Sequence, residues 1–354
     1  MKIKIISALV SLILCMGMSI SLSSCTESEN KKNPSGTSGE NESETETPPM
    51  ELAQADDLSY VFINDGKYCA VIGLNAENGA IRVEIPETYQ GIPVVAISSG
   101  AFASSIHLKS VELPNSLKYI GNHAFNDCSN LESINIPESL EYLGSQAFDG
   151  CDKLPLTEYN GALYLGNESA PYTILMSAKD TKFDGTCTVH TDTKIINELA
   201  FADCTEIDKI IIPNGIRYIG SDAFEFCLEL EYTTYESVKY LGNENNPYLV
   251  CVDVNAKRSS VSYTIHEDTK IIAPAAFAGC DKLETVNIPN GLKTIGEYAF
   301  DDCPKIKRIE FDRISVWAVV DNEDFDSSVF IENSDINTKE MLLYTHKHCA
   351  WIRQ

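Results

Sequence analysis

The sequence lacks most of the patterns that carry enzyme chemistry. It contains no phosphate-binding loop, dinucleotide fingerprint or nucleophile elbow, and no two cysteines have the CxxC spacing of zinc and thioredoxin-type sites. Basic residues are scarce, because 27 lysines and arginines stand against 52 acidic residues and give a net charge of −25. Such a surface repels nucleic acid and anionic membranes. We therefore expect no catalysis, no cofactor and no nucleic acid partner.

The sequence does contain a repeat, marked by the dipeptide Ala-Phe. Its phenylalanines follow one another at steps of 23 or 53 residues, and the longer step is one ordinary repeat plus a coil of 30 residues. These phenylalanines are Phe102, Phe125, Phe148, Phe201, Phe224, Phe277 and Phe300. Cysteine stands three residues after every one except the first, which has Ser105. A fixed period of this length is typical of a solenoid.

Each ordinary repeat predicts one coil of the solenoid. The repeat usually ends in the pattern L-x-x-I-x-I-P, as in Leu131–Pro137 and Leu283–Pro289. The alternating apolar residues indicate a half-buried strand, and the proline ends it because it has no N–H for the ladder. A short apolar pair such as Tyr119-Ile120 follows, then glycine and the next Ala-Phe. Stacked coils should form a parallel strand ladder around one continuous core.

Three segments depart from the ordinary repeat and predict hairpins. Tyr60–Leu74 has two β-rich runs around Asn64-Asp65-Gly66, and we interpret it as the N-terminal cap of the solenoid. The two coils of 30 residues, Asn160–Val189 and Glu236–Ile265, align with each other, and each has β-rich runs on both sides of a Gly-Asn turn. We expect the hairpin in each to replace the short return segment of an ordinary coil.

The repeated pattern resembles the BspA-like leucine-rich repeat family over roughly Ser59–Phe311. The resemblance implies a β-rich solenoid whose repeats are not catalytic. Members of that family are typically bacterial surface or secreted proteins, and several are implicated in adhesion to host proteins and other cells. It therefore implies binding of a protein or other macromolecule on a host or neighbouring cell. An envelope scaffold with a bacterial partner is the first alternative, and an enzyme with an unrecognised site is the second.

The N-terminus predicts export and a lipid anchor. Lys2 and Lys4 precede an apolar run, and Leu22-Ser23-Ser24-Cys25 resembles the bacterial lipobox, in which the cysteine is lipidated and becomes the new N-terminus. Cys25 would then hold the protein at the extracellular face of the bacterial envelope, through its lipid alone. Plain secretion and an uncleaved transmembrane helix are the alternatives.

These features predict four parts of the chain. Residues 1–24 are a lipoprotein signal peptide, and residues 25–52 are a disordered acidic tether because they hold almost nothing apolar. Residues 53–312 are the leucine-rich repeat solenoid with its N-terminal cap, and residues 313–354 are a C-terminal cap or tail.

The cysteines and the C-terminal segment suggest other chemistry only weakly. The six repeat cysteines are predicted to be buried free thiols, because in-register side chains point the same way and cannot bridge, whereas Cys69, Cys187, Cys251 and Cys349 follow no pattern. His346-Lys347-His348-Cys349 is a poor match to a metal site and is interpreted as an exposed terminal strand. The acidic residues Asp321, Glu323, Asp324 and Asp326 lack the spacing of an EF-hand and are interpreted as a solvated loop.

The strand positions between the buried ones predict a candidate binding face. Two columns of side chains should point outward, and they are mostly polar, without the aromatic row that sugar stacking would suggest. One column contains Glu112, Asn135, Ile211, Asn287 and Glu310, and the other contains Ser110, Ser133, Lys209, Thr285 and Arg308. We call these ten residues the candidate face. His190 and His266 take the place that proline has after other strands, and we interpret them as structural.

Overall fold

The computed structural model describes residues 50–75, 79–183, 185–254, 260–311, 315–320, 329–332, 342 and 347–354. These residues belong to one compact unit, Thr47–Gln354. As the repeat predicted, the protein is a β-solenoid of about 10 turns with parallel strand stacking and almost no helix. The described residues include a single 3₁₀ turn, η1 (Ala55–Asp57).

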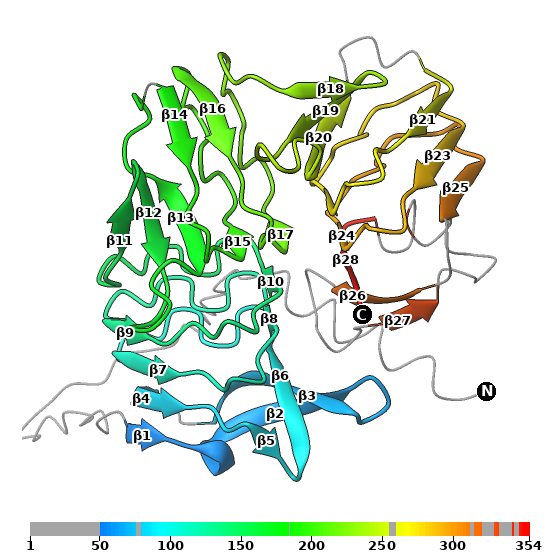
Figure 1. Ribbon diagram of the computed structural model, residues 1–354. Coiled ribbons are helices and arrows are strands. Elements are labelled where there is room, and N and C mark those ends of the chain that lie inside the picture. Colours follow the sequence, from blue (N-terminus) through cyan, green and yellow to red (C-terminus); the bar gives the residue numbers. More distant parts are fainter. Residues whose placement is uncertain are drawn as a thin grey trace, which may run out of the picture. The chain divides into compact units, whose positions relative to one another are not determined.

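One side of the coils carries a parallel strand ladder, which we call the front ladder. It is built from three separate segments rather than one continuous sheet (Figure 1). The first contains β1 (Met50–Ala53), β4 (Ala80–Glu84), β7 (Ser110–Glu112) and β9 (Ser133–Ile134). The second contains β14 (Gly185–Thr188) and β16 (Ile207–Ile211), and the third contains β21 (Ser262–Thr264), β23 (Thr285–Ile288) and β25 (Arg308–Phe311). Strand β1 begins at Met50, so the expected boundary at residue 53 falls inside it.

The short apolar pairs form a second set of parallel strands, which we call the return ladder. Its members are β6 (Ile92–Ile97), β8 (Tyr119–Ile120), β10 (Tyr142–Leu143), β15 (Ile195–Ile196), β17 (Tyr218–Ile219), β22 (Ile271–Ile272) and β24 (Thr294–Ile295). Glycine follows four of these strands, at Gly121, Gly144, Gly220 and Gly296, and permits close contact between coils. A Cβ on Gly144 or Gly220 would lie 2.4 Å from a backbone nitrogen of the preceding coil, so no other residue fits without displacing the backbone.

Both long coils contain the hairpin that the sequence predicted. The first consists of β11 (Thr157–Tyr159), β12 (Ala162–Leu165) and β13 (Ile174–Ala178), and the second of β18 (Thr233–Tyr235), β19 (Val238–Leu241) and β20 (Val250–Val254). The last arm of each hairpin joins the return ladder in parallel, with Ile174 opposite Ile195 and Val250 opposite Ile271. The first arm pairs antiparallel with its own hairpin and adds no strand to the front ladder. This explains why the front ladder stops after β9 and again after β16.

The Ala-Phe turns fill the interior, as their apolar character predicted. The phenylalanine rings of consecutive coils stack, with centroids 5.3 Å apart for Phe102 and Phe125 and 5.5 Å apart for Phe125 and Phe148. The Cys128 thiol donates to the Phe102 carbonyl at 3.1 Å, and Cys151, Cys227 and Cys303 repeat this contact with the preceding phenylalanine. The ten cysteines of the described residues are buried.

Additional strands close both ends of the return ladder: β3 (Tyr68–Leu74) joins β6 in parallel at one end, and β28 (Ala350–Arg353) joins β24 antiparallel at the other. At the N-terminal end, β2 (Leu58–Ile63) and β3 form the predicted hairpin, and β5 (Thr88–Tyr89) pairs with β6. At the other end lie β26 (Val316–Val320), β27 (Val329–Glu332) and β28. The expectation of an exposed terminal strand was wrong: Cys349 and Trp351 are buried, because β28 lies between β24 and β26.

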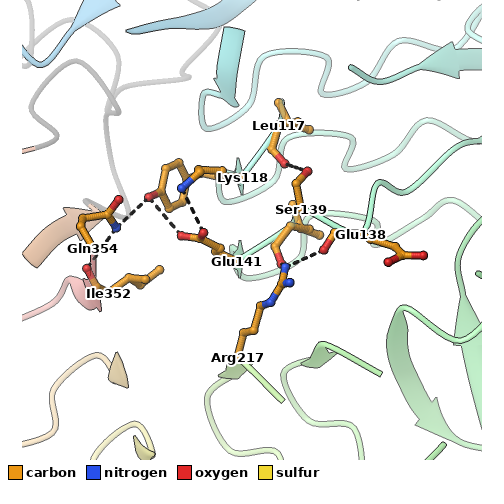
Figure 2. Close-up of polar contacts among 10 residues, drawn as sticks. Leu117, Lys118, Glu138, Ser139, Glu141, Arg217, Ile352 and Gln354 are labelled. Atoms are coloured by element: carbon orange, nitrogen blue, oxygen red, sulfur yellow. Dashed lines mark hydrogen bonds and ion pairs between the residues drawn. The ribbon is translucent and has the colours of Figure 1, made fainter. Parts of the chain in front are cut away.

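Polar contacts connect both neighbouring coils and segments that are distant in sequence (Figure 2). The Lys118 ammonium lies 3.0 Å from the Glu141 carboxylate, and the Gln354 amide donates to the Tyr119 hydroxyl at 3.4 Å. The Arg217 guanidinium donates to the carbonyl oxygens of Leu140, at 2.9 Å, and Glu138. The return ladder therefore binds the C-terminal cap and a coil from another repeat block through backbone and side-chain hydrogen bonds.

Candidate functional site

The candidate face lies on the front ladder, at positions fixed by strand register. Its side chains alternate with buried residues along each strand, and the register places Ser110 opposite Ser133 and Asn287 opposite Glu310. The exposed members are Glu112, Ser133, Lys209, Arg308 and Glu310, and the half-buried members are Ser110, Asn135, Ile211, Thr285 and Asn287. The two columns are interrupted after β9 and after β16, where the hairpins replace the next front strand.

Each interruption of the front ladder borders a cavity. The first, of about 660 Å³, is lined by Glu112, Ser133 and Asn135 together with the Gly-Asn turn of the first hairpin. The second, of about 180 Å³, is lined by Lys209 and Ile211 and by the equivalent turn of the second hairpin. Pro155 lines the first cavity and has no N–H to give to β9, whereas Glu231 at the equivalent place donates to the Asp208 carbonyl at 2.8 Å. This backbone hydrogen bond joins the segments beside the second opening, and proline cannot form it beside the first.

The Gly-Asn turn that lines these cavities is a rigid backbone feature. The side-chain Oδ1 of Asn167 accepts hydrogen bonds from the backbone N–H groups of Ser169 and Ala170, and its side-chain Nδ2 donates to the Ile136 carbonyl at 2.7 Å. Asn243 repeats these contacts with the Ile212 carbonyl, also at 2.7 Å. The walls of both openings are therefore held in place before any partner binds.

Three members of the candidate face already have partners. The Asn135 amide donates to the Leu113 carbonyl at 3.0 Å and accepts from the Leu113 N–H at 2.5 Å, so it joins two coils. The Arg308 guanidinium lies 3.3 Å from the Glu310 carboxylate, with side chains 69% and 50% exposed. An ion pair this exposed adds little stability and leaves both charges available to a partner.

Each long coil contains an aromatic cluster that the sequence pattern did not predict. Tyr172 stacks on His190 with centroids 3.8 Å apart, and Tyr159 stands edge-on to both rings. Tyr248, His266 and Tyr235 repeat the arrangement in the second long coil. The alignment of the two long coils could have predicted these clusters, because it places three tyrosines and one histidine at equivalent positions. Both histidines therefore pack inside these clusters.

Other predicted sites lie outside the described residues or are not formed within them. Cys25, His346 and the acidic residues Asp321–Asp326 are outside the described ranges. Among the residues that the structure describes, no three histidine, cysteine or acidic side chains are grouped to hold a metal ion. In the same part of the chain, no helix has the length and apolar character needed to cross a membrane.

The coil geometry and the repeat define a leucine-rich repeat solenoid. The model of the BspA-type leucine-rich repeat region matches six copies over residues 82–169, 182–246 and 255–349. The chain therefore belongs to the BspA-type leucine-rich repeat family. Solenoids of this family are typically non-enzymatic, and leucine-rich repeat proteins generally bind protein partners. No curated protein matches the chain.

Several solved structures are similar to the chain. A T. pallidum leucine-rich repeat protein is 22% identical, with 71% of this chain and 89% of that chain covered and a TM-score of 0.33. A leucine-rich cell surface protein from Faecalibacterium prausnitzii is 20% identical, with coverage of 75% and 77% and a TM-score of 0.31. A leucine-rich repeat protein from Bacteroides ovatus is 22% identical, with coverage of 73% and 70% and a TM-score of 0.32.

Proposed function

We propose that this chain is a lipid-anchored, non-enzymatic surface protein that binds a protein on a host or neighbouring cell through the candidate face. The supporting observation is the register of the front ladder, which repeats outward-facing side chains from coil to coil. A repeated row of this kind presents an extended surface, and such surfaces suit macromolecular partners. The two openings along the ladder add cavities to that surface, so a partner can insert side chains as well as lie flat.

The second and third segments of the front ladder carry the residues best suited to binding. Lys209 and Ile211 point to the same side of β16, because side chains two residues apart share a face of a strand. Arg308 and Glu310 do the same on β25. An apolar side chain among exposed charges of both signs offers contact area and a means of orienting the partner.

A binding measurement with a combined variant tests this proposal. The full chain is applied to immobilised host matrix proteins and cell-envelope extracts, and surface plasmon resonance gives the affinity. Changing Lys209, Ile211, Arg308 and Glu310 together to alanine should weaken binding at least tenfold, a loss of about 1.4 kcal/mol or more. The matched control changes Lys282, Leu228, Lys305 and Glu229, which are exposed in the turns that follow Ala-Phe, and it should leave the affinity within about twofold.

Two further observations separate this proposal from its alternatives. Deleting residues 26–49 should leave the affinity unchanged, and raising the salt concentration should lower it, because exposed charges are screened beyond about 8–10 Å at physiological ionic strength. Binding that disappears only when the tether is removed would contradict the role of the candidate face. A hydrolytic activity abolished by one point substitution would contradict the proposal as a whole.

The lipid anchor has a separate test. Cells that express the full chain are labelled with a fatty acid analogue, and the label on the wild type is compared with that on Cys25→Ala. The motif Leu22-Ser23-Ser24-Cys25 predicts a labelled wild type in the membrane fraction and an unlabelled variant. An unlabelled wild type, or equal labelling of both chains, would remove the anchor from the proposal.

A further inference from the structure

The aromatic cluster of the second long coil is built as a rigid wall. Tyr248 and His266 stack with centroids 3.7 Å apart and an interplanar angle of 17°, and Tyr235 stands at 86° to the His266 ring. Two hydrogen bonds fix His266. Its backbone N–H donates to the Tyr240 hydroxyl at 3.2 Å, and its ring Nδ1 accepts from the backbone N–H of Asp268 at 3.3 Å. Tyr235 is therefore held in one orientation while remaining half-buried.

This wall borders a cavity of about 280 Å³ that also holds polar groups. Its lining combines the Tyr235 and His266 rings with the side chains of Thr264, Glu267 and Asn287. Thr264 and Asn287 stand opposite each other on β21 and β23, and Glu267 follows His266 directly. An aromatic ring, an amide, a carboxylate and a hydroxyl thus converge on a space just below the usual range for small-molecule sites, about 300–1,000 Å³.

The first long coil has the same aromatic frame but a different polar set. Tyr159, Tyr172 and His190 repeat the rings, whereas Ile211 stands opposite Thr188 where the second coil has Asn287 opposite Thr264. Thr191 follows His190 where Glu267 follows His266. Packing of the hairpin alone accounts for the shared rings. It does not require the amide and the carboxylate, which occur only in the second coil.

We propose that the cavity bordered by Tyr235, His266, Glu267 and Asn287 is a binding subsite for one ring of a neutral saccharide. The C–H bonds on one face of a sugar ring carry partial positive charge and pack against the electron-rich face of an aromatic ring. The Asn287 amide can both donate to and accept from ring hydroxyls, and the Glu267 carboxylate accepts from them. The same carboxylate, on a chain of net charge −25, disfavours acidic sugars.

The subsite adds to the proposed function and does not depend on it. Asn287 belongs to the candidate face, so a glycan carried by a protein partner would lie within reach of the same ladder. The subsite would also bind free saccharide with the rest of the candidate face altered. The combined variant at Lys209, Ile211, Arg308 and Glu310 should therefore keep its saccharide affinity, so the two proposals fail separately.

A glycan array of neutral and acidic di- to tetrasaccharides tests the subsite with the full chain. We expect neutral members to bind, and isothermal titration with the best free tetrasaccharide then gives the affinity. Tyr235→Ala should weaken it at least tenfold, and Asn287→Ile, which copies the residue of the first long coil, about fivefold or more. Tyr159→Ala removes the equivalent ring of the first coil, and it should change the affinity less than twofold.

Three results would overturn the proposal. The first is a wild-type chain that binds no neutral saccharide at millimolar concentration. The second is equal loss of affinity in Tyr235→Ala and Tyr159→Ala, which would indicate a general effect on the fold. The third is a protein partner whose binding depends on Tyr235 and is not competed by saccharide, because the cavity would then accept a peptide side chain. A thermal unfolding scan of each variant confirms that the comparison is made on folded protein.

Discussion

Single residues in the Ala-Phe turns adopt a backbone conformation that most amino acids avoid. The residue two places after each phenylalanine has a positive φ, and glycine or aspartate holds this place in five of the seven turns. Phe226 is the bulky exception, with φ of 56° and a side chain 57% exposed. Left-handed backbone costs an L-residue about 1–2 kcal/mol, whereas glycine adopts it freely. The backbone conformation of Phe226 therefore costs free energy that Gly150 and Gly279, at the same place in two other turns, avoid.

Replacing Phe226 with glycine should stabilise the protein. We expect Phe226→Gly to raise the free energy of unfolding by about 0.5–1 kcal/mol, because the relief of the strained φ exceeds the extra chain entropy of glycine. Urea unfolding followed by circular dichroism measures the change. The control is Leu228→Gly, which removes a side chain that is even more exposed, 73%, at a residue outside the positive-φ positions. A gain in both variants, or a loss in Phe226→Gly, would contradict the backbone explanation.

Elements of three repeat blocks meet at a buried carboxyl group. Tyr142 on β10 and Tyr218 on β17 pack with centroids 4.8 Å apart, and the Tyr218 hydroxyl donates to Glu297, which follows β24, at 2.6 Å. Burial raises the pKa of the Glu297 carboxyl above its usual value, and hydrogen bonds from Tyr218 and Tyr142 oppose this only in part. The return strands therefore pack best when Glu297 is protonated.

The pH dependence of stability follows from this shift. Because the folded pKa of Glu297 exceeds the unfolded one, about 4.3, its contribution to stability is greatest below that pH and is lost as the pH rises toward the folded pKa. Glu297→Gln should remove this loss and raise the free energy of unfolding at pH 8 by about 1 kcal/mol or more, with little change at pH 4. Chemical unfolding of the wild type and the variant at both pH values measures this difference in the free energy of unfolding. The control Glu229→Gln, at an exposed residue, should leave the free energy of unfolding unchanged at both pH values. A Glu297→Gln variant that is less stable than the wild type at pH 8 would contradict this explanation.

The elements show how far periodicity predicts this fold. The front strands, the return pairs, the N-terminal hairpin and the last arms of both long coils follow from repeated apolar positions and turn residues. The position of Glu297 does not, because the same place in other turns holds Asn122, Ser145 or Ser221, and only contacts between blocks bury it. The burial of β28 also escaped prediction, because its partner β24 lies more than 50 residues earlier in the chain.

For the whole molecule, the sequence predicts the surface better than the sites on it. Nine of the ten residues of the candidate face lie in strands of the front ladder, and Asn135 directly follows β9. Strand alternation could not show that the hairpins divide that ladder, because division depends on where the first hairpin arm pairs. It also could not show that the Asn135 amide forms hydrogen bonds with the backbone of a neighbouring coil. Nor could it show that Tyr235 and Asn287 border one cavity. Those facts depend on side-chain directions across separate coils.

We propose that a partner binds the front ladder and not another side of the solenoid. Site-specific photo-crosslinking measures this most directly, with a photoreactive amino acid in place of Lys209 on the front ladder or of Lys293, which is exposed beside the return ladder. The full chain is irradiated with the partner identified by surface plasmon resonance. We predict a crosslinked partner from position 209 and none from position 293. Crosslinking that is equal at both positions, or stronger from 293, would contradict it.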